Sequence, residues 1–242
     1  MSLINASFLD VVKKQIFFKV RSYYGTFTSL ITVQVIALLF SFNGVGQMGL
    51  GNISISTYSG STIFVFTIFW TFITAVTLTT KPYFYIDFSF VTNRLSSHLS
   101  TVGMLVVYSF IASTTSTFAG ILLRVILFFK DGSTKIIADH FFLSFSDLLV
   151  GIYIGTLYLL LFATLGYFIG MFTQISKLFA FVIPALFIGW AIYEVSANDT
   201  VSYILFFFTE TSILIFTIKV VATVALMVLA VIAATNRLEV RK

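Results

Sequence analysis

Long apolar runs with almost no charge constrain this sequence more than any other feature. A helix needs about 20 consecutive, mostly apolar residues to cross the hydrocarbon core of a bilayer. Six segments approach or exceed that length: 26–42, 62–80, 102–128, 148–170, 177–194 and 211–235. Charged residues make up only 10% of the chain, against about 25% in soluble domains. The sequence therefore predicts an all-α integral membrane protein, with 1–242 as a single transmembrane domain of six transmembrane helices.

Lysine and arginine gather in alternate connecting segments, and this bias orients the helices. Ten of the fourteen basic residues fall in the N-terminal segment, the second and fourth connections and the C-terminus. Cytoplasmic segments carry such an excess. We expect a multi-pass protein of the cell membrane with both termini cytoplasmic. Orientation explains the net charge of +5, so nucleic acid is not an expected partner.

An amphipathic segment precedes the first span, over 7–23. It places Phe8, Val12 and Ile16 on one helical face, while Lys13 lies on the opposite side and Lys19 intrudes on the apolar face. Such a helix lies in the membrane surface, with its basic residues at the anionic headgroups. Membrane lipid is therefore an expected partner of this segment.

A polar stretch, YIDFSFVTNRLSSHLS (85–100), separates the second and third spans. At 100° per residue, its apolar residues Phe88, Val91, Leu95 and Leu99 fall within an arc of about 80°, and polar residues occupy most of the remaining surface. The pattern predicts a short cytoplasmic helix. It either lies on the membrane or docks into a groove on a cytoplasmic partner, a common mode of recognition.

The connection between the fourth and fifth spans, within LGYFIGMFTQISKLFAFVIP (165–184), offers a second cytoplasmic contact point. Six spans with contact points in these two connections resemble the permease subunit of an exporter-type ATP-binding-cassette (ABC) transporter. The resemblance is to the ABC-2, or type V, family, and covers the whole chain. Gram-positive members that export peptides, lantibiotics or drugs are similar in size and in their high phenylalanine content.

The resemblance implies a location and a role for several segments. It implies an interfacial helix at 7–23, a coupling helix at 87–99 and a short re-entrant hairpin at 195–210, before the sixth span. Residues in the two cytoplasmic connections would contact the ATPase: Phe88, Val91, Asn93, Arg94, Leu95, Thr173, Gln174 and Lys177.

Nucleotide chemistry is expected in a partner rather than in this chain. A phosphate-binding loop of the form GxxxxGK[ST] uses glycine amides and a lysine, and no Gly-Lys pair occurs in this sequence. The chain is therefore expected to be no enzyme and to hold no cofactor. By resemblance, two copies of a cytoplasmic ATP-binding subunit would bind ATP and Mg, and a second permease copy or a paralogue would complete the transporter. Its cargo would be an apolar or amphipathic peptide, antimicrobial or lipid-like molecule.

Alternative functions find less support in the sequence. No cysteine is present, and the two histidines, His98 and His140, are predicted to lie in loops, so we expect neither a metal site nor an intramembrane hydrolase. Lys219 and Arg124 lie toward the outer ends of their spans, and Glu210 lies in the outer interface or the hairpin. The lack of a charge at the midplane counts against an ion-coupled carrier. A secondary carrier or channel without an ATPase partner is the alternative to the permease.

Two patterns inside the spans concern packing or transport. Gly151, Gly155, Gly166 and Gly170 share one face of the fourth span, and such small residues let helices approach closely. The third span carries six hydroxyl residues between positions 109 and 117. They serve either helix packing or a translocation path, and the candidate path residues are Ser109, Ser113, Thr114, Ser116 and Thr117.

Overall fold

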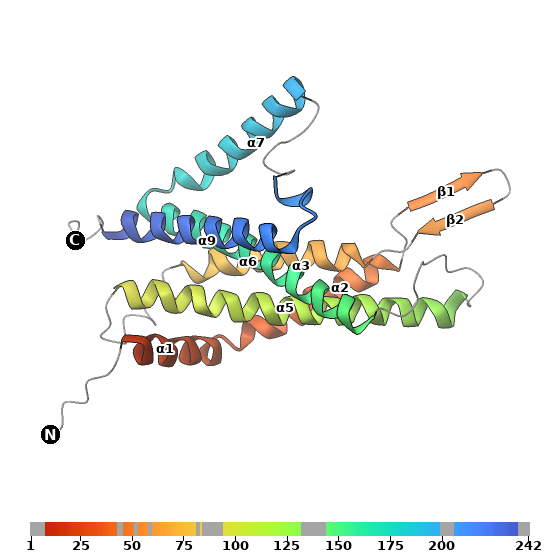
Figure 1. Cartoon of the computed structure of the whole chain (residues 1–242), viewed down its shortest axis with the longest axis horizontal. Helices are drawn as coiled ribbons and strands as arrows, with labels where there is room; N and C mark the ends of the chain where they lie inside the picture. The colour runs from red at the N-terminus through yellow and green to blue at the C-terminus, as the bar shows by residue number, and fades with distance from the viewer. Residues whose placement is uncertain are drawn as a thin grey trace. The chain divides into compact units, whose positions relative to one another are not determined.

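The fold is a set of long apolar helices with a small antiparallel pair of β-strands (Figure 1). The structure is a computed structural model that describes residues 8–42, 46–50, 53–57, 60–80, 83, 94–131, 144–198 and 206–236. In chain order the elements are α1 (Phe8–Ser22), α2 (Gly25–Ser41), β1 (Gly46–Leu50), β2 (Ile53–Thr57), α3 (Ser61–Leu78), α5 (Arg94–Asp131), α6 (Phe145–Ile175), α7 (Phe179–Asn198) and α9 (Ile213–Asn236).

A helix occupies the position of each predicted span. Four of them, α3, α5, α6 and α9, are long and apolar enough to cross a membrane. The pair α1 and α2, bent by 56° at a short break, counts as a fifth. The apolar part of α7, Phe179–Val195, is shorter. Within the described residues the chain is therefore a multi-pass helical membrane protein with four or five membrane-length helices.

The connection between the first two predicted spans, 42–61, is rich in glycine and serine, as loops are, but it contains β structure. Strands β1 and β2 pair antiparallel, in a register that joins Gly46 to Thr57 and Leu50 to Ile53 (Figure 1). Ile53 and Ile55 alternate with Ser54 and Ser56, and this period-two pattern of β-branched residues favours a strand. The prediction of an all-α chain holds for the membrane-length helices but not for this hairpin.

The chain divides into two compact units, each built from segments that are distant in sequence. Unit 1 comprises Met1–Lys19, Phe72–Leu105 and Leu160–Lys242, and unit 2 comprises Val20–Thr71 and Val106–Leu159. Residues of α3, α5 and α6 belong to both units.

Unit 2 has two apolar clusters with polar groups buried beside them. The clusters are formed by Leu30, Trp70, Ala112 and Leu159, and by Ala37, Ile63, Leu123 and Leu127. The buried Gln34 donates from Nε2 to the Ala112 carbonyl oxygen at 3.3 Å and to Thr115 Oγ1 at 3.0 Å. Trp70 donates from Nε1 to Ser29 Oγ at 2.9 Å. These bonds offset the cost of burying polar groups among apolar ones.

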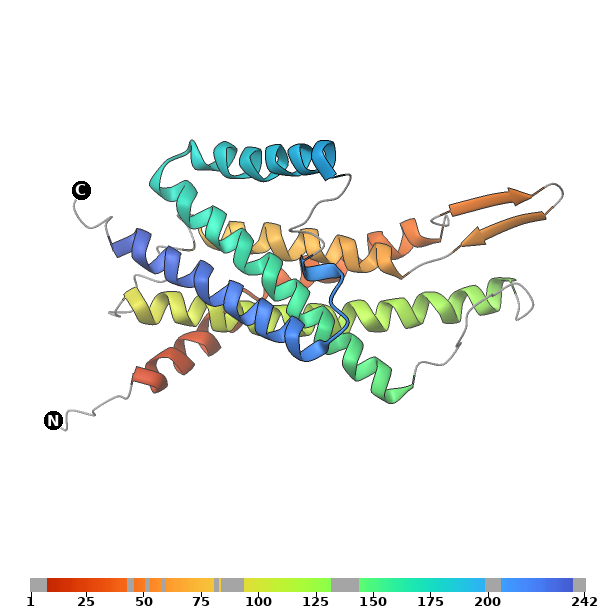
Figure 2. The same ribbon diagram turned by 45° about the horizontal axis from the view of Figure 1, so that its top comes forward.

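Among its described residues, unit 1 has an apolar cluster built from α3, α5, α6 and α9. Its members are Ala75, Leu105, Ala163, Tyr167, Met171 and Val231. In both Figure 1 and Figure 2, α1, the start of α5 and the end of α9 lie at the same end of this unit. That end holds the residues from which a functional site can be built.

Candidate functional site

The predicted coupling segment continues directly into a membrane-length helix. We predicted a short helix over 87–99 and a span beginning at 102, but α5 runs without a break from Arg94 to Asp131. No glycine or proline interrupts 94–102, and the hydroxyls of Ser100 and Thr101 bond back to the Ser97 carbonyl oxygen. The first half of the segment, including Phe88, Val91 and Asn93, lies outside the described residues.

The first turns of α5 bury their polar side chains and expose their apolar ones. Ser96, His98 and Ser100 are buried, whereas Leu95 is 42% exposed and Leu99 is 38% exposed. The arrangement is the reverse of that in a water-soluble helix, in which apolar residues face the core. Leu95 and Leu99 therefore remain accessible to lipid or to a protein partner.

His98 joins three helices, and its predicted position in a loop is wrong. It lies in α5, is 8% exposed, and places Nδ1 2.7 Å from the Tyr167 hydroxyl of α6 and Nε2 3.0 Å from Thr235 Oγ1 of α9. The Thr235 hydroxyl donates to the carbonyl oxygens of Val231 and Ile232. With its own proton engaged, Thr235 is assigned as the acceptor from Nε2, and in this Nε2–H tautomer Nδ1 accepts from the Tyr167 hydroxyl.

Helix α1 packs on the start of α5 through a partly polar face. Val12, Gln15 and Lys19 are buried, and Ile16 lies against Gly103. Lys19 Nζ donates to Thr101 Oγ1 at 2.7 Å and to the Ser97 carbonyl oxygen at 3.2 Å. Lys19 thus sits on the apolar face because that face meets the hydroxyls and the carbonyl of α5.

We expect Lys19→Met to loosen α1 without unfolding the chain. Methionine retains most of the apolar stem but removes bonds from a charged donor, each of which contributes about 1.5–3 kcal/mol. Amide hydrogen exchange in Val11–Phe18 should become at least tenfold faster. Lys13→Met, at an exposed position of the same helix, is the matched control and should leave exchange unchanged. Equal exchange in both variants would contradict this role for Lys19.

The end of α6 meets the end of α3, at the second predicted contact point. Gln174 donates from Nε2 to the Thr79 carbonyl oxygen, and Gly170 lies against the Thr79 side chain. Thr173 bonds back to the Ile169 carbonyl oxygen, and Lys177 lies in the turn after α6. The connections that follow α3 and α6 therefore start next to each other in unit 1.

Close helix approaches occur at three of the four glycines in α6. A Cβ on Gly166 would lie 2.6 Å from the Phe72 carbonyl oxygen, and one on Gly170 would overlap Thr79 Oγ1. In unit 2, a Cβ on Gly155 would overlap Ser113 Oγ. A Cβ on Gly151, by contrast, would have no neighbouring atom within 4 Å.

The hydroxyl residues of α5 bond mainly to backbone carbonyls. Ser113 donates to the Ile152 carbonyl oxygen of α6 at 2.9 Å, and Thr114 and Thr117 bond back to the preceding turn of α5. Ser109 and Ser116 are buried. These contacts are typical of helix packing.

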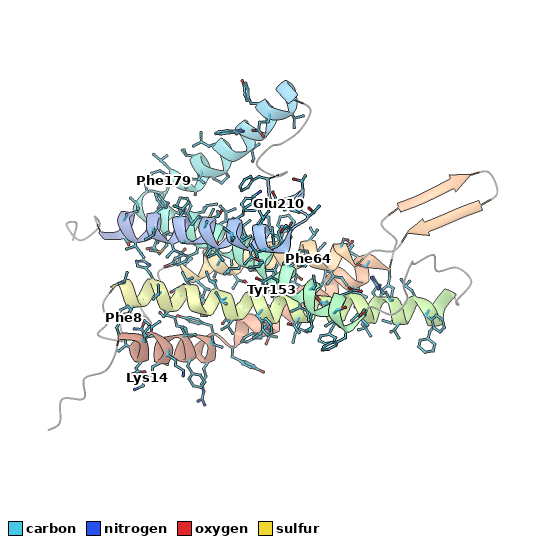
Figure 3. The ribbon with its side chains drawn as sticks, in the orientation of Figure 1. Phe8, Lys14, Phe64, Tyr153, Phe179 and Glu210 are labelled. Atoms are coloured by element: carbon cyan, nitrogen blue, oxygen red, sulfur yellow. The ribbon has the colours of Figure 1, made fainter. Side chains whose placement is uncertain are left out.

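An ion pair stands at the start of α9. Lys219 Nζ contacts Glu210 Oε1, donates to the Phe206 carbonyl oxygen at 3.1 Å, and lies 3.8 Å from the centre of the Phe206 ring. Figure 3 shows Glu210 beside the first turns of α9. The sequence placed both charges near the end of a span but did not indicate that they form an ion pair. They are nine residues apart, with the start of α9 between them, so they lack the three- or four-residue spacing of ion pairs within a helix.

Residues 199–205 of the predicted re-entrant segment, 195–210, lie outside the described residues. On either side of them, α7 ends at Asn198 and Phe206–Phe208 form one helical turn. Within the part of α7 whose side chains are described, no residue is fully buried. Trp190 donates from Nε1 to Glu194 Oε1 at 2.8 Å, one turn along the same helix.

Comparisons with protein-family models, with curated proteins and with solved structures give no match to this chain.

Proposed function

We propose that this chain is the membrane-spanning permease subunit of an ABC exporter of the ABC-2 type. It would move an apolar or amphipathic peptide, antimicrobial or lipid-like molecule out of a bacterial cell. A separate cytoplasmic subunit, present in two copies, would bind ATP and Mg and hydrolyse the ATP. A second permease copy or a paralogue would complete the transporter, and both termini would be cytoplasmic.

One observation carries this proposal: the polar-inside, apolar-outside turns at the start of α5 are linked to three other helices in unit 1. His98 connects them to α6 and α9, and Lys19 connects them to α1. A push on the exposed Leu95 and Leu99 would therefore act on several helices together. A surface helix that only lay on lipid would not need these buried connections.

The contact point after α6 would act with the one before α5. Gln174 ties the end of α6 to the end of α3, so a partner that contacts both connections would move α3 and α6 together. Lys177 lies beside this contact in the turn after α6 and would meet an acidic partner surface. As part of the same proposal, the chain would cross the membrane six times and α1 would lie in the membrane surface.

The exposed leucines provide the test. We expect an ATPase to co-purify with the tagged wild-type chain from its native membrane in mild detergent, and Leu95→Asp with Leu99→Asp to abolish that co-purification. The matched control is Phe129→Asp, at an 82% exposed position near the other end of α5, which should retain the ATPase. ATP hydrolysis by the eluates is the readout. If no ATPase accompanies the wild type, a carrier or channel becomes the better assignment.

A further inference from the structure

The segment before α9 surrounds the Lys219 ammonium with three kinds of cation acceptor. They are the carboxylate of Glu210, the carbonyl oxygen of Phe206 and the face of the Phe206 ring. A carboxylate gives a charge-assisted bond, and an aromatic face attracts a cation through its quadrupole. Together these groups match the chemistry of an ammonium head group.

This site remains accessible from outside. The side chains of Lys219 and Glu210 are 19% and 23% exposed, and Phe206 is half-exposed. A cation arriving from solvent or from the membrane surface can therefore reach Glu210 without unfolding α9. Lys219 has a long flexible stem and can extend toward water when it is displaced.

Apolar surface adjoins the charged groups. Exposed side chains lie on the turn before α9 and on its first two turns: Phe206, Phe208, Ile213, Leu214, Ile215 and Ile218. An alkyl chain or apolar side chain attached to an ammonium group could lie along Phe206 and along Ile215, which is one turn before Lys219 on the same helical face. The combination fits a cationic amphiphile better than a small inorganic cation, which prefers a shell of oxygen ligands.

We propose that Glu210 and Phe206 form a binding site for the ammonium group of a cationic amphiphile, such as an alkylamine or a lysine-bearing peptide, and that Lys219 is its built-in competitor. Lys219 occupies the site until a ligand displaces it. Identifying this ligand as the exported cargo rests on the proposed function, whereas the site itself does not.

Binding of hexylammonium, with hexan-1-ol as its uncharged analogue, tests the site in the full chain reconstituted into nanodiscs. Saturation-transfer NMR would compare wild type, Lys219→Met, and Lys219→Met combined with Glu210→Gln. We expect Lys219→Met to bind hexylammonium roughly tenfold more tightly than wild type, because removing an internal competitor raises the fraction of open sites. The double variant should lose the preference for hexylammonium over hexanol.

Two further variants keep the test decisive. Lys219→Arg retains a competing cation and should bind like wild type. Lys219→Gln retains a donor to Glu210 and replaces Lys219→Met if the latter is not monodisperse. Equal binding by wild type and both neutral variants, or a preference that survives Glu210→Gln, would overturn the proposal. Because no ATPase is present in this assay, its result is independent of the co-purification experiment.

Discussion

Gly166→Ala should lower the stability of this protein by about 1–3 kcal/mol, the usual cost of forcing an extra carbon into a packed interface. The new Cβ would lie 2.6 Å from the Phe72 carbonyl oxygen and 3.2 Å from Ala75 Cβ. The closest atom belongs to the backbone of α3, which cannot move aside as a flexible side chain can. Helix propensity favours alanine by about 1 kcal/mol, so the overpacking has to exceed that gain.

Gly151→Ala is the matched control because it makes the same chemical change in the same helix. No atom lies within 4 Å of its new Cβ, so propensity alone acts and stability should stay equal or rise. Thermal unfolding in detergent, followed by light scattering, would compare the two variants with wild type. We expect Gly166→Ala to melt about 5 °C lower; equal melting of both variants would show that α3 and α6 do not pack closely at this glycine.

His98→Leu should be the most damaging substitution at the start of α5, with a loss of about 2–4 kcal/mol. Leucine can neither accept from the Tyr167 hydroxyl nor donate to Thr235, so the substitution removes one hydrogen bond to α6 and another to α9. The apolar cluster around Tyr167 offers little water to replace them. The exposed Leu95→Ala serves as the comparison and should change stability by less than about 0.5 kcal/mol.

A double-mutant cycle separates the lost bond from the changed shape of the side chain. Tyr167→Phe removes the hydroxyl that donates to His98, so adding His98→Leu to it should cost less than His98→Leu does alone. The difference should be about 0.5–3 kcal/mol for directly bonded partners. Strict additivity of the two substitutions in urea or thermal unfolding would refute a direct bond between the two side chains.

The helices were predictable because membrane insertion leaves a simple signal. Each long apolar run corresponds to an observed helix, and the predicted span 62–80 differs from α3 (Ser61–Leu78) by only one or two residues at each end. The hairpin at 46–57 was missed because its glycines and serines are equally typical of a loop. Its isoleucine and serine alternation was the available signal.

The arrangement at the start of α5 was harder to predict from sequence. The helical wheel correctly separated Leu95 and Leu99 from Ser96 and His98, but it could not tell which face would be buried. That choice depends on Tyr167 and Thr235, which lie 69 and 137 residues away from His98. Lys19 is a similar case, because its polar partners on α5, Ser97 and Thr101, lie 78 and 82 residues later in the chain.

The sequence separation between His98 and its partners also determines when, during synthesis of the chain, its hydrogen bonds can form. Translation at about 5–20 residues per second separates the synthesis of His98 from that of Thr235, 137 residues later, by roughly ten seconds. During that interval the imidazole has no Thr235 to donate to, and only the final helix completes its bonding. A nascent chain that stalls before α9 would therefore lack the link that His98 makes between α5 and α9.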